Sequence, residues 1–190
     1  MAQQERVGVF GGSFNPPHVG HVLAATYLRS VDAVDRVLVI PVFRHPFAKP
    51  LAPYEDRMAM CRLAMEGLAG VEVSDIEGQL GGESRTLVTI EELHRRAPHH
   101  ALRLVIGADV LGDRDNWHRF DRIAELAPPI ILGRAGFDHP EAPPAVLPDV
   151  SSSHLRQLVA EDRIDEAAPW LPAAVRRYVE DHDLYRGGPS

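Results

Sequence analysis

Residues 7–21 read VGVFGGSFNPPHVGH, and the order of residue types in this stretch is typical of the first strand, loop and helix of an α/β fold. Four small or apolar residues run into two glycines, and then Asn, two prolines and His-Val-Gly-His follow. The pattern predicts a buried strand, a tight loop and the start of a helix, because glycine permits close approach to the backbone and proline suits a first helical turn. In open α/β sheets, ligands bind at the carboxyl ends of strands, where this loop would lie.

Short, β-branched-rich runs and amphipathic segments alternate along the rest of the chain. The apolar runs are nearly continuous, as in buried parallel strands, and the segments between them carry apolar residues at helical spacing. We therefore expect an α/β protein with a Rossmann-like, doubly wound parallel sheet and helices on both faces. The expected strands are 6–10, 36–40, 71–73, 102–106 and 130–132, and the expected helices are 18–30, 55–68 and 86–96.

The chain is expected to form a single domain over residues 1–190, with its core in about 1–137. Residues 138–149 contain four prolines in twelve positions, so we expect a loop that ends the wound sheet. Two further helical patterns, 151–160 and 172–183, lie in a C-terminal extension that runs to 186. Because these helices are too short to form a domain, we expect them to pack back on the sheet.

Composition disfavours several classes of function. The net charge of −7 argues against nucleic acid as a partner, since such binding relies on many phosphate contacts. A single cysteine, Cys61, allows neither an internal disulfide nor a cysteine metal cluster. No apolar run approaches the roughly 18 residues of a membrane span, and the N-terminus has no signal-peptide pattern. We expect a cytoplasmic protein with no membrane partner; a homo-oligomer stays open.

The loop and helix start suit an anionic ligand. The two glycines would let a ligand approach the backbone, and Asn15 is expected to cap the helix, whose N-terminus attracts anions. His18 and His21 share a helix face and can donate to phosphoryl oxygens, while Gly20 between them leaves room for the ligand. The alternative is a pair of capping or packing histidines. Neither the Walker pattern nor the dinucleotide pattern G-x-G-x-x-G is present, and we find no third ligand for a zinc site.

The segment GGSFNPPHVGH resembles the signature of the nucleotidylyltransferase superfamily, with residues 18–21 as its H-x-G-H element. The form GGSFNPPH is closest to the bacterial nicotinate mononucleotide adenylyltransferases, and matches to that family run from residue 7 to about 186. The resemblance implies transfer of AMP from ATP to nicotinate mononucleotide, which gives nicotinate adenine dinucleotide and pyrophosphate in NAD synthesis. It implies two small-molecule partners, ATP and a pyridine mononucleotide, with Mg²⁺ as the cofactor that accompanies ATP.

A second element, VSSSHLR at 150–156, resembles the I-S-S-T-x-I-R element that holds the β- and γ-phosphates in that family. A plain serine N-cap is the alternative, although three hydroxyls and an arginine can converge on phosphate. In IGAD at 106–109, Asp109 could accept from a ribose hydroxyl or cap the next helix. The resemblance implies His18, His21 and Arg156 as catalytic residues. It implies an ATP site made of Gly11, Gly12, Ser13, Phe14, His18, Gly20, His21, Ile106, Gly107, Asp109, Ser151, Ser152, Ser153 and Arg156.

The acceptor site is expected among residues of other segments. Trp117 lies in a polar loop and could stack on a pyridine ring, as the resemblance also implies. Thr86 lies in a segment similar to the family's S-Y-T-x-x-T-L, whose Thr region binds the nicotinate carboxylate, although Arg85 replaces the usual Tyr. Arg134 resembles the arginine of the family's R-P-G, and Lys49 is the only lysine of the chain. The expected acceptor residues are Lys49, Thr86, Trp117, His118 and Arg134, and no residue is expected to bind a metal.

Two alternatives to this function stay open at this point. One is a sister nucleotidylyltransferase that uses nicotinamide mononucleotide or phosphopantetheine, because Arg85 and Val42 depart from the family pattern. The other is a non-catalytic nucleotide-binding sensor that has kept the pocket and lost turnover.

Overall fold

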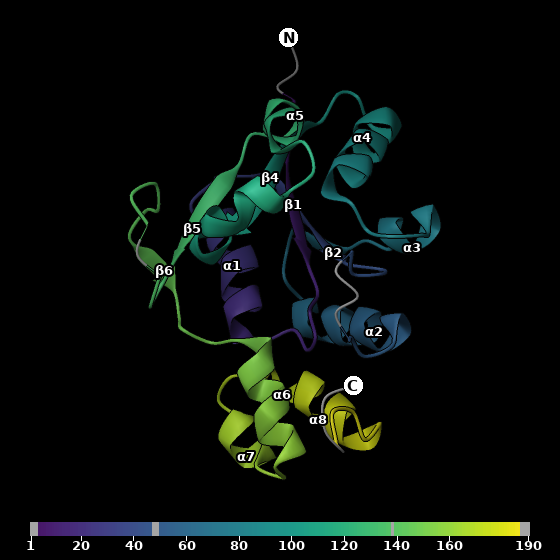
Figure 1. The fold of residues 1–190 in the computed structure, drawn as a ribbon, viewed down its shortest axis with the longest axis vertical. Helices are drawn as coiled ribbons and strands as arrows, with labels where there is room; N and C mark the ends of the chain where they lie inside the picture. The colour runs from purple at the N-terminus through teal and green to yellow at the C-terminus, as the bar shows by residue number, and fades with distance from the viewer. Residues whose placement is uncertain (1–3, 47–49, 138, 187–190) are drawn as a thin grey trace.

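The computed structural model describes residues 4–46, 50–137 and 139–186, and its strands form a six-stranded parallel sheet (Figure 1). The strand order is β3-β2-β1-β4-β5-β6, and each neighbouring pair is parallel. This is the strand order of a doubly wound Rossmann sheet, so the expected fold class is confirmed. The strands are β1 (Arg6–Gly12), β2 (Arg36–Pro41), β3 (Val71–Val73), β4 (Ala101–Gly107), β5 (Ile130–Arg134) and β6 (Ala145–Leu147).

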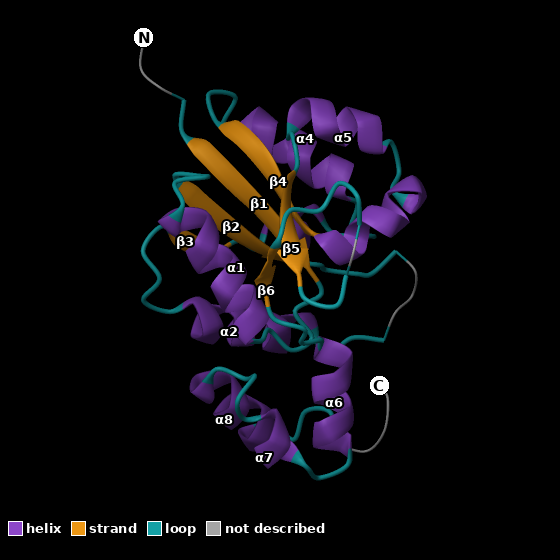
Figure 2. Cartoon of the chain, turned by 90° about the vertical axis from the view of Figure 1, so that its left-hand side faces the viewer, coloured by secondary structure: helices purple, strands orange, loops and turns teal. Residues whose placement is uncertain are grey.

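Helices cover both faces of the sheet (Figure 2). Successive side chains of a strand point to opposite faces, so Val37 and Val39 of β2 join one apolar cluster, and Leu38 and Ile40 join the other. The first cluster contains residues of α1 and α2, and the second contains residues of α3, α4 and α5. These helices are α1 (Val19–Ser30), α2 (Tyr54–Met65), α3 (Ile76–Leu80), α4 (Thr86–Arg96) and α5 (Phe120–Leu126), and a 3₁₀ helix, η1 (Ala108–Asn116), follows β4.

The C-terminal extension differs from the expectation. It forms three helices, α6 (Ser152–Ala160), α7 (Ile164–Ala167) and α8 (Ala173–Asp181), which lie at the foot of the molecule in Figure 1. α8 packs on α2, and the Tyr178 hydroxyl donates to Asp56 Oδ1 over 2.9 Å. Buried residues of the extension join the apolar cluster that contains α1, α2 and strand residues such as Val39 and Leu132, so the extension adds to the helical layer on that face of the sheet.

The prediction of a loop over residues 138–149 was wrong at 145–147. Those three residues form β6, which pairs in parallel with the end of β5 and occupies the sheet edge. The prolines on either side hid this strand, although none of them falls inside it. Gly133 of β5 makes the approach possible, because a Cβ at that position would collide with the backbone carbonyls of Pro143 and Pro144.

Within the described ranges, no helix is long and apolar enough to cross a lipid bilayer.

Candidate active site

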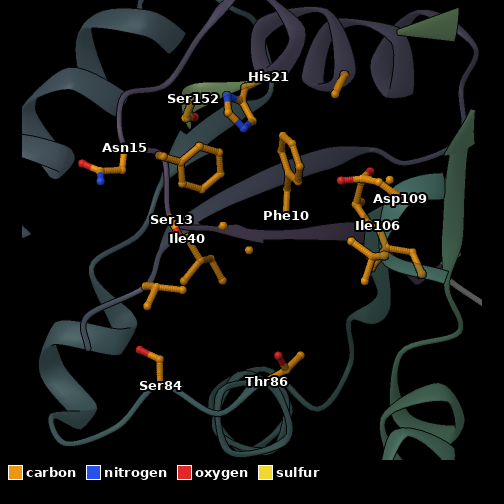
Figure 3. Close-up of a pocket in the computed structure, with 18 of the residues that line it drawn as sticks. Phe10, Ser13, Asn15, His21, Ile40, Ser84, Thr86, Ile106, Asp109 and Ser152 are labelled. Atoms are coloured by element: carbon orange, nitrogen blue, oxygen red, sulfur yellow. The ribbon is translucent and has the colours of Figure 1, made fainter. Parts of the chain in front are cut away.

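A cavity of about 590 Å³ opens at the carboxyl ends of the central strands (Figure 3). Its volume is typical of a small-molecule site. Lys49 lies outside the described residues. All the other residues predicted for the site line this cavity, namely Gly11, Gly12, Ser13, Phe14, His18, Gly20, His21, Thr86, Ile106, Gly107, Asp109, Trp117, His118, Arg134, Ser151, Ser152, Ser153 and Arg156.

The two histidines form a stacked pair, with ring centroids 3.8 Å apart. The His21 ring packs edge-on against Phe14, with ring centroids 4.8 Å apart. Phe10 lies beside the same ring at 6.0 Å (Figure 3). Burial lowers the pKa of His18 to about 4, and the nearby Arg134 guanidinium adds to this effect. Burial also lowers the pKa of His21 far below its usual range, helped by His18 and Arg134. Both imidazoles are therefore neutral at pH 7 in the free protein.

The start of α1 differs from the expectation, because His18 and not Asn15 is the N-cap. The backbone N–H of His18 donates to Nδ1 of His21 over 3.1 Å, an arrangement that resembles half of a capping box. The buried Asn15 side chain serves another purpose. Its Oδ1 accepts from the backbone N–H of Ala52 (3.1 Å) and from the Tyr185 hydroxyl (2.9 Å). Asn15 therefore joins the loop after β1 (the first loop) to the loop after β2 and to the segment that follows α8.

Three serines at the start of α6 have different partners. Ser151 is the N-cap, and its Oγ accepts from the backbone N–H of His154 over 3.3 Å. The Ser152 hydroxyl donates to the backbone carbonyl of Pro16 over 2.9 Å, whereas Ser153 is exposed. The hydroxyl of Ser152 therefore holds α6 against the first loop, and Ser153 is the serine most open to a ligand.

Arg156 lies on the same helix and points toward the first loop. Its Nη1 donates to the backbone carbonyl of Asn15 over 2.8 Å, and its Nη2 donates to Ser153 Oγ over 3.4 Å. The guanidinium is thus fixed between the two elements that sequence reasoning assigned to phosphate. A planar guanidinium keeps its charge and has five N–H donors, so donors remain for an anion in the cavity.

Asp109 and Arg134 form an ion pair in the wall of the cavity, beside the segment that precedes α6. Arg134 Nη1 lies 3.1 Å from Asp109 Oδ2, and its Nη2 donates to the backbone carbonyl of Val150 over 2.6 Å. The Arg134 side chain is 16% exposed, so it is held in place and not simply solvated. A Cβ at Gly107 would collide with the Asp109 carboxylate, which explains why glycine suits the end of β4.

The wall near α4 carries the other acceptor candidates and a buried carboxylate that sequence reasoning missed. Thr86 is the first residue of α4, and Trp117 packs edge-on against Phe120. Glu77 is 7% exposed, and its Oε1 accepts from the Thr89 hydroxyl over 2.7 Å. Burial raises the pKa of Glu77. The sequence did not indicate that Glu77 is buried at the site, because it lies in the short helix α3, which the spacing of apolar residues did not predict.

A model of the cytidylyltransferase-like family matches residues 9–158. The chain belongs to the cytidylyltransferase-like family. The family match includes the loop after β1, both histidines and the start of α6, so it spans the two halves of the proposed phosphate site.

Relatives of known name cover almost the whole chain. A protein of Anaeromyxobacter dehalogenans (strain 2CP-C), named "Probable nicotinate-nucleotide adenylyltransferase", is 44% identical and covers 98% of this chain and 100% of its own. A protein of the same name from Thermus thermophilus is 37% identical, with 95% and 100% covered. Among solved structures, Plasmodium falciparum nicotinic acid mononucleotide adenylyltransferase complexed with NaAD has a TM-score of 0.83 at 16% identity, covering 95% of this chain and 97% of that one. At that identity the likeness shows a shared fold.

Proposed function

We propose that this member of the cytidylyltransferase-like family is a nicotinate-nucleotide adenylyltransferase. It transfers AMP from ATP to nicotinate mononucleotide and releases pyrophosphate and nicotinate adenine dinucleotide, a step of NAD synthesis. The observation that carries the proposal is one cavity that joins the histidine pair, the start of α6 and the Thr86–Trp117 wall. Relatives that are 37–44% identical over nearly the whole chain support it by their names.

The reaction is an in-line displacement at the α-phosphorus of ATP. A 5′-phosphate oxygen of the acceptor forms a bond to that phosphorus, and the bond from the α-phosphorus to the bridging oxygen breaks. The bridging oxygen leaves with the electron pair as part of pyrophosphate. Because this chemistry needs no covalent enzyme intermediate, positioning and charge stabilisation supply most of the rate.

The residues of the first loop and of α6 suit the triphosphate. Nδ1 of neutral His21 accepts from the backbone of His18, so the proton of its ring is on Nε2, which can donate to a phosphoryl oxygen. Nδ1 of His18 is buried without a hydrogen-bond partner in the described part of the chain, and the residue lines the cavity. Arg156 and the serines at the start of α6 would hold the leaving pyrophosphate.

The acceptor is assigned to the opposite side of the cavity. Trp117 would stack on the pyridine ring, and Thr86 and His118 would bind the nicotinate carboxylate or the ribose. Arg134 is proposed for the acceptor phosphate, and its charge adds to burial in lowering the pKa of His18 and of His21, so it lies near both substrates' proposed sites. Lys49 stays a candidate for the same phosphate.

We propose that Mg²⁺ enters as part of MgATP and does not occupy a resident metal site. In the described residues, no group of three or more His, Cys, Asp or Glu side chains could hold an ion, so the phosphates and water would supply its ligands. We further propose that the chain works as one catalytic domain in the cytoplasm.

An acceptor panel tests the proposal. Purified protein, ATP and Mg²⁺ are combined in parallel with nicotinate mononucleotide, nicotinamide mononucleotide or phosphopantetheine, and pyrophosphate release is measured. The fastest release is expected with nicotinate mononucleotide. Preference for another acceptor would reassign the substrate, whereas ATP binding by calorimetry without pyrophosphate release would indicate a nucleotide sensor.

A further inference from the structure

Arg57 is a buried cation beneath the site. It belongs to α2 and is 1% exposed, which makes it the largest fully buried side chain described. Among the residues that the structure describes, no carboxylate lies within ion-pair distance of its guanidinium. Burying a charge without a partner is costly, so the position must satisfy the guanidinium in another way.

Backbone carbonyls take the place of a carboxylate. Nε donates to the carbonyl of Ala52 (2.9 Å), Nη1 donates to those of Val42 (2.7 Å) and Ser13 (3.1 Å), and Nη2 donates to that of Phe43 (3.3 Å). Ser13 belongs to the loop after β1, and the other three acceptors belong to the loop after β2. One planar side chain therefore connects the two loops.

The two loops belong to different halves of the proposed site. The loop after β1 leads to the histidine pair, whereas the backbone N–H of Phe43 donates to Ser84 Oγ over 2.8 Å, two residues before Thr86. Ser13 and Ser84 both line the cavity (Figure 3). A shift of the Arg57 guanidinium would therefore be transmitted to the backbone of both loops, one beside the proposed ATP site and the other beside the proposed acceptor site.

We propose that Arg57 is a positioning residue for adenylyl transfer, which sets the distance between the loop that holds ATP and the loop that leads to the acceptor. The inference rests on the proposed function, because it needs two substrates that react in line. A misplacement of about 1 Å can reduce such a rate about a hundredfold. Lysine could keep the charge at this position, but its three donors on a flexible stem cannot reproduce a rigid fork to four carbonyls.

The first test compares Arg57→Lys with Arg62→Lys, a matched change at an exposed arginine of the same helix. For Arg57→Lys, the Michaelis constants of both substrates should rise and kcat should fall at least tenfold, while Arg62→Lys should behave as wild type. Unchanged constants in folded Arg57→Lys, or a change in only one Michaelis constant, would overturn the proposal.

Hydrogen exchange gives a second readout that needs no turnover. In ligand-free Arg57→Lys, the amides of residues 11–15 and 18, of 42–45 and of 51–52 should exchange faster together, while the other strands and helices keep their protection. A uniform increase across the chain would indicate lost stability alone and would overturn the inference. If the wild type releases no pyrophosphate, the proposed function fails, and the exchange pattern still decides whether Arg57 fixes both loops.

Chemical rescue covers the case in which Arg57→Lys does not fold. Millimolar guanidinium should restore part of the activity and the loop protection of Arg57→Ala, whereas equal concentrations of ammonium or urea should not, because only guanidinium is both charged and planar. Failure of both variants to fold, with guanidinium present for Arg57→Ala, would assign Arg57 to stability and overturn the positioning role.

Discussion

The Arg156 guanidinium donates to the backbone carbonyl of Asn15 over 2.8 Å, although 141 positions separate the two residues. The Ser152 hydroxyl makes a parallel contact to Pro16 over 2.9 Å. The start of α6 is therefore held against the first loop before any ligand binds. Such preorganisation lowers the cost of ordering side chains when a ligand arrives.

Arg156→Lys should weaken this arrangement. Lysine keeps the charge but cannot reach the Asn15 carbonyl and Ser153 Oγ with one rigid fork, so we expect the Michaelis constant for ATP to rise about tenfold. Steady-state kinetics with varied ATP provide the measurement. Arg163→Lys, at an exposed position beyond the same helix, is the control and should match wild type.

Replacement of His18 separates a catalytic imidazole from a simple cap. Asn is a favoured N-cap residue, so His18→Asn should fold normally, yet its rate of pyrophosphate release should fall about a hundredfold. His94→Asn, at an exposed position of α4, should leave the rate unchanged. If His18→Asn kept nearly full activity, the role of His18 would be reduced to capping.

The buried His18 imidazole also predicts how stability depends on pH. Its pKa is about 4 in the folded protein and 6.5 in the unfolded chain, so the unfolded state binds more protons between those values. The free energy of unfolding should therefore fall as pH decreases from 6.5 to 4, by roughly 3 kcal/mol from this group alone. Urea unfolding at pH 7 and pH 4.5 should show a smaller fall for His18→Asn than for wild type, and His94→Asn should fall as wild type does.

The chain offers two tryptophans, which makes a matched test of the acceptor wall possible. Trp117→Ala should raise the Michaelis constant for the pyridine mononucleotide about tenfold, because stacking of a ring on an aromatic side chain contributes about 1–3 kcal/mol. The Michaelis constant for ATP should change little. Trp170→Ala, at a site 37% exposed outside the cavity lining, should affect neither constant. Equal effects of the two variants would contradict the assignment of Trp117.

The sequence was sufficient to predict the fold class and to assign to one site two distant segments, 11–21 and 151–156, that line the same cavity. Continuous apolar runs predicted the strands, and the spacing of His18 and His21 predicted a shared face, although their stacked rings were not foreseen. β6 was not predicted, because an apolar run of only three residues between two prolines is too short to indicate a strand. Its position depends on the pairing of Ala145 with Gly133 of β5, a contact that the pattern of residues 145–147 alone does not predict.

Arg57 and Glu77 show why other parts of the site could not be predicted. An arginine among polar residues at the start of α2 is typical of a solvated helix face, and its true partners are backbone carbonyls, which leave no mark in the sequence. Glu77 likewise becomes a buried group only when Thr89 and the loop after β2 enclose it. Both roles arise from tertiary packing.

The bond from Tyr185 to Asn15 links a residue near one end of the chain to the loop beside the histidine pair. During protein synthesis, the segment that carries Asn15 leaves the ribosome 170 residues before Tyr185 does. Until then the Asn15 carboxamide lacks one of its two partners. The proposed nucleotide pocket therefore reaches its final form only after Tyr185 has been added to the chain.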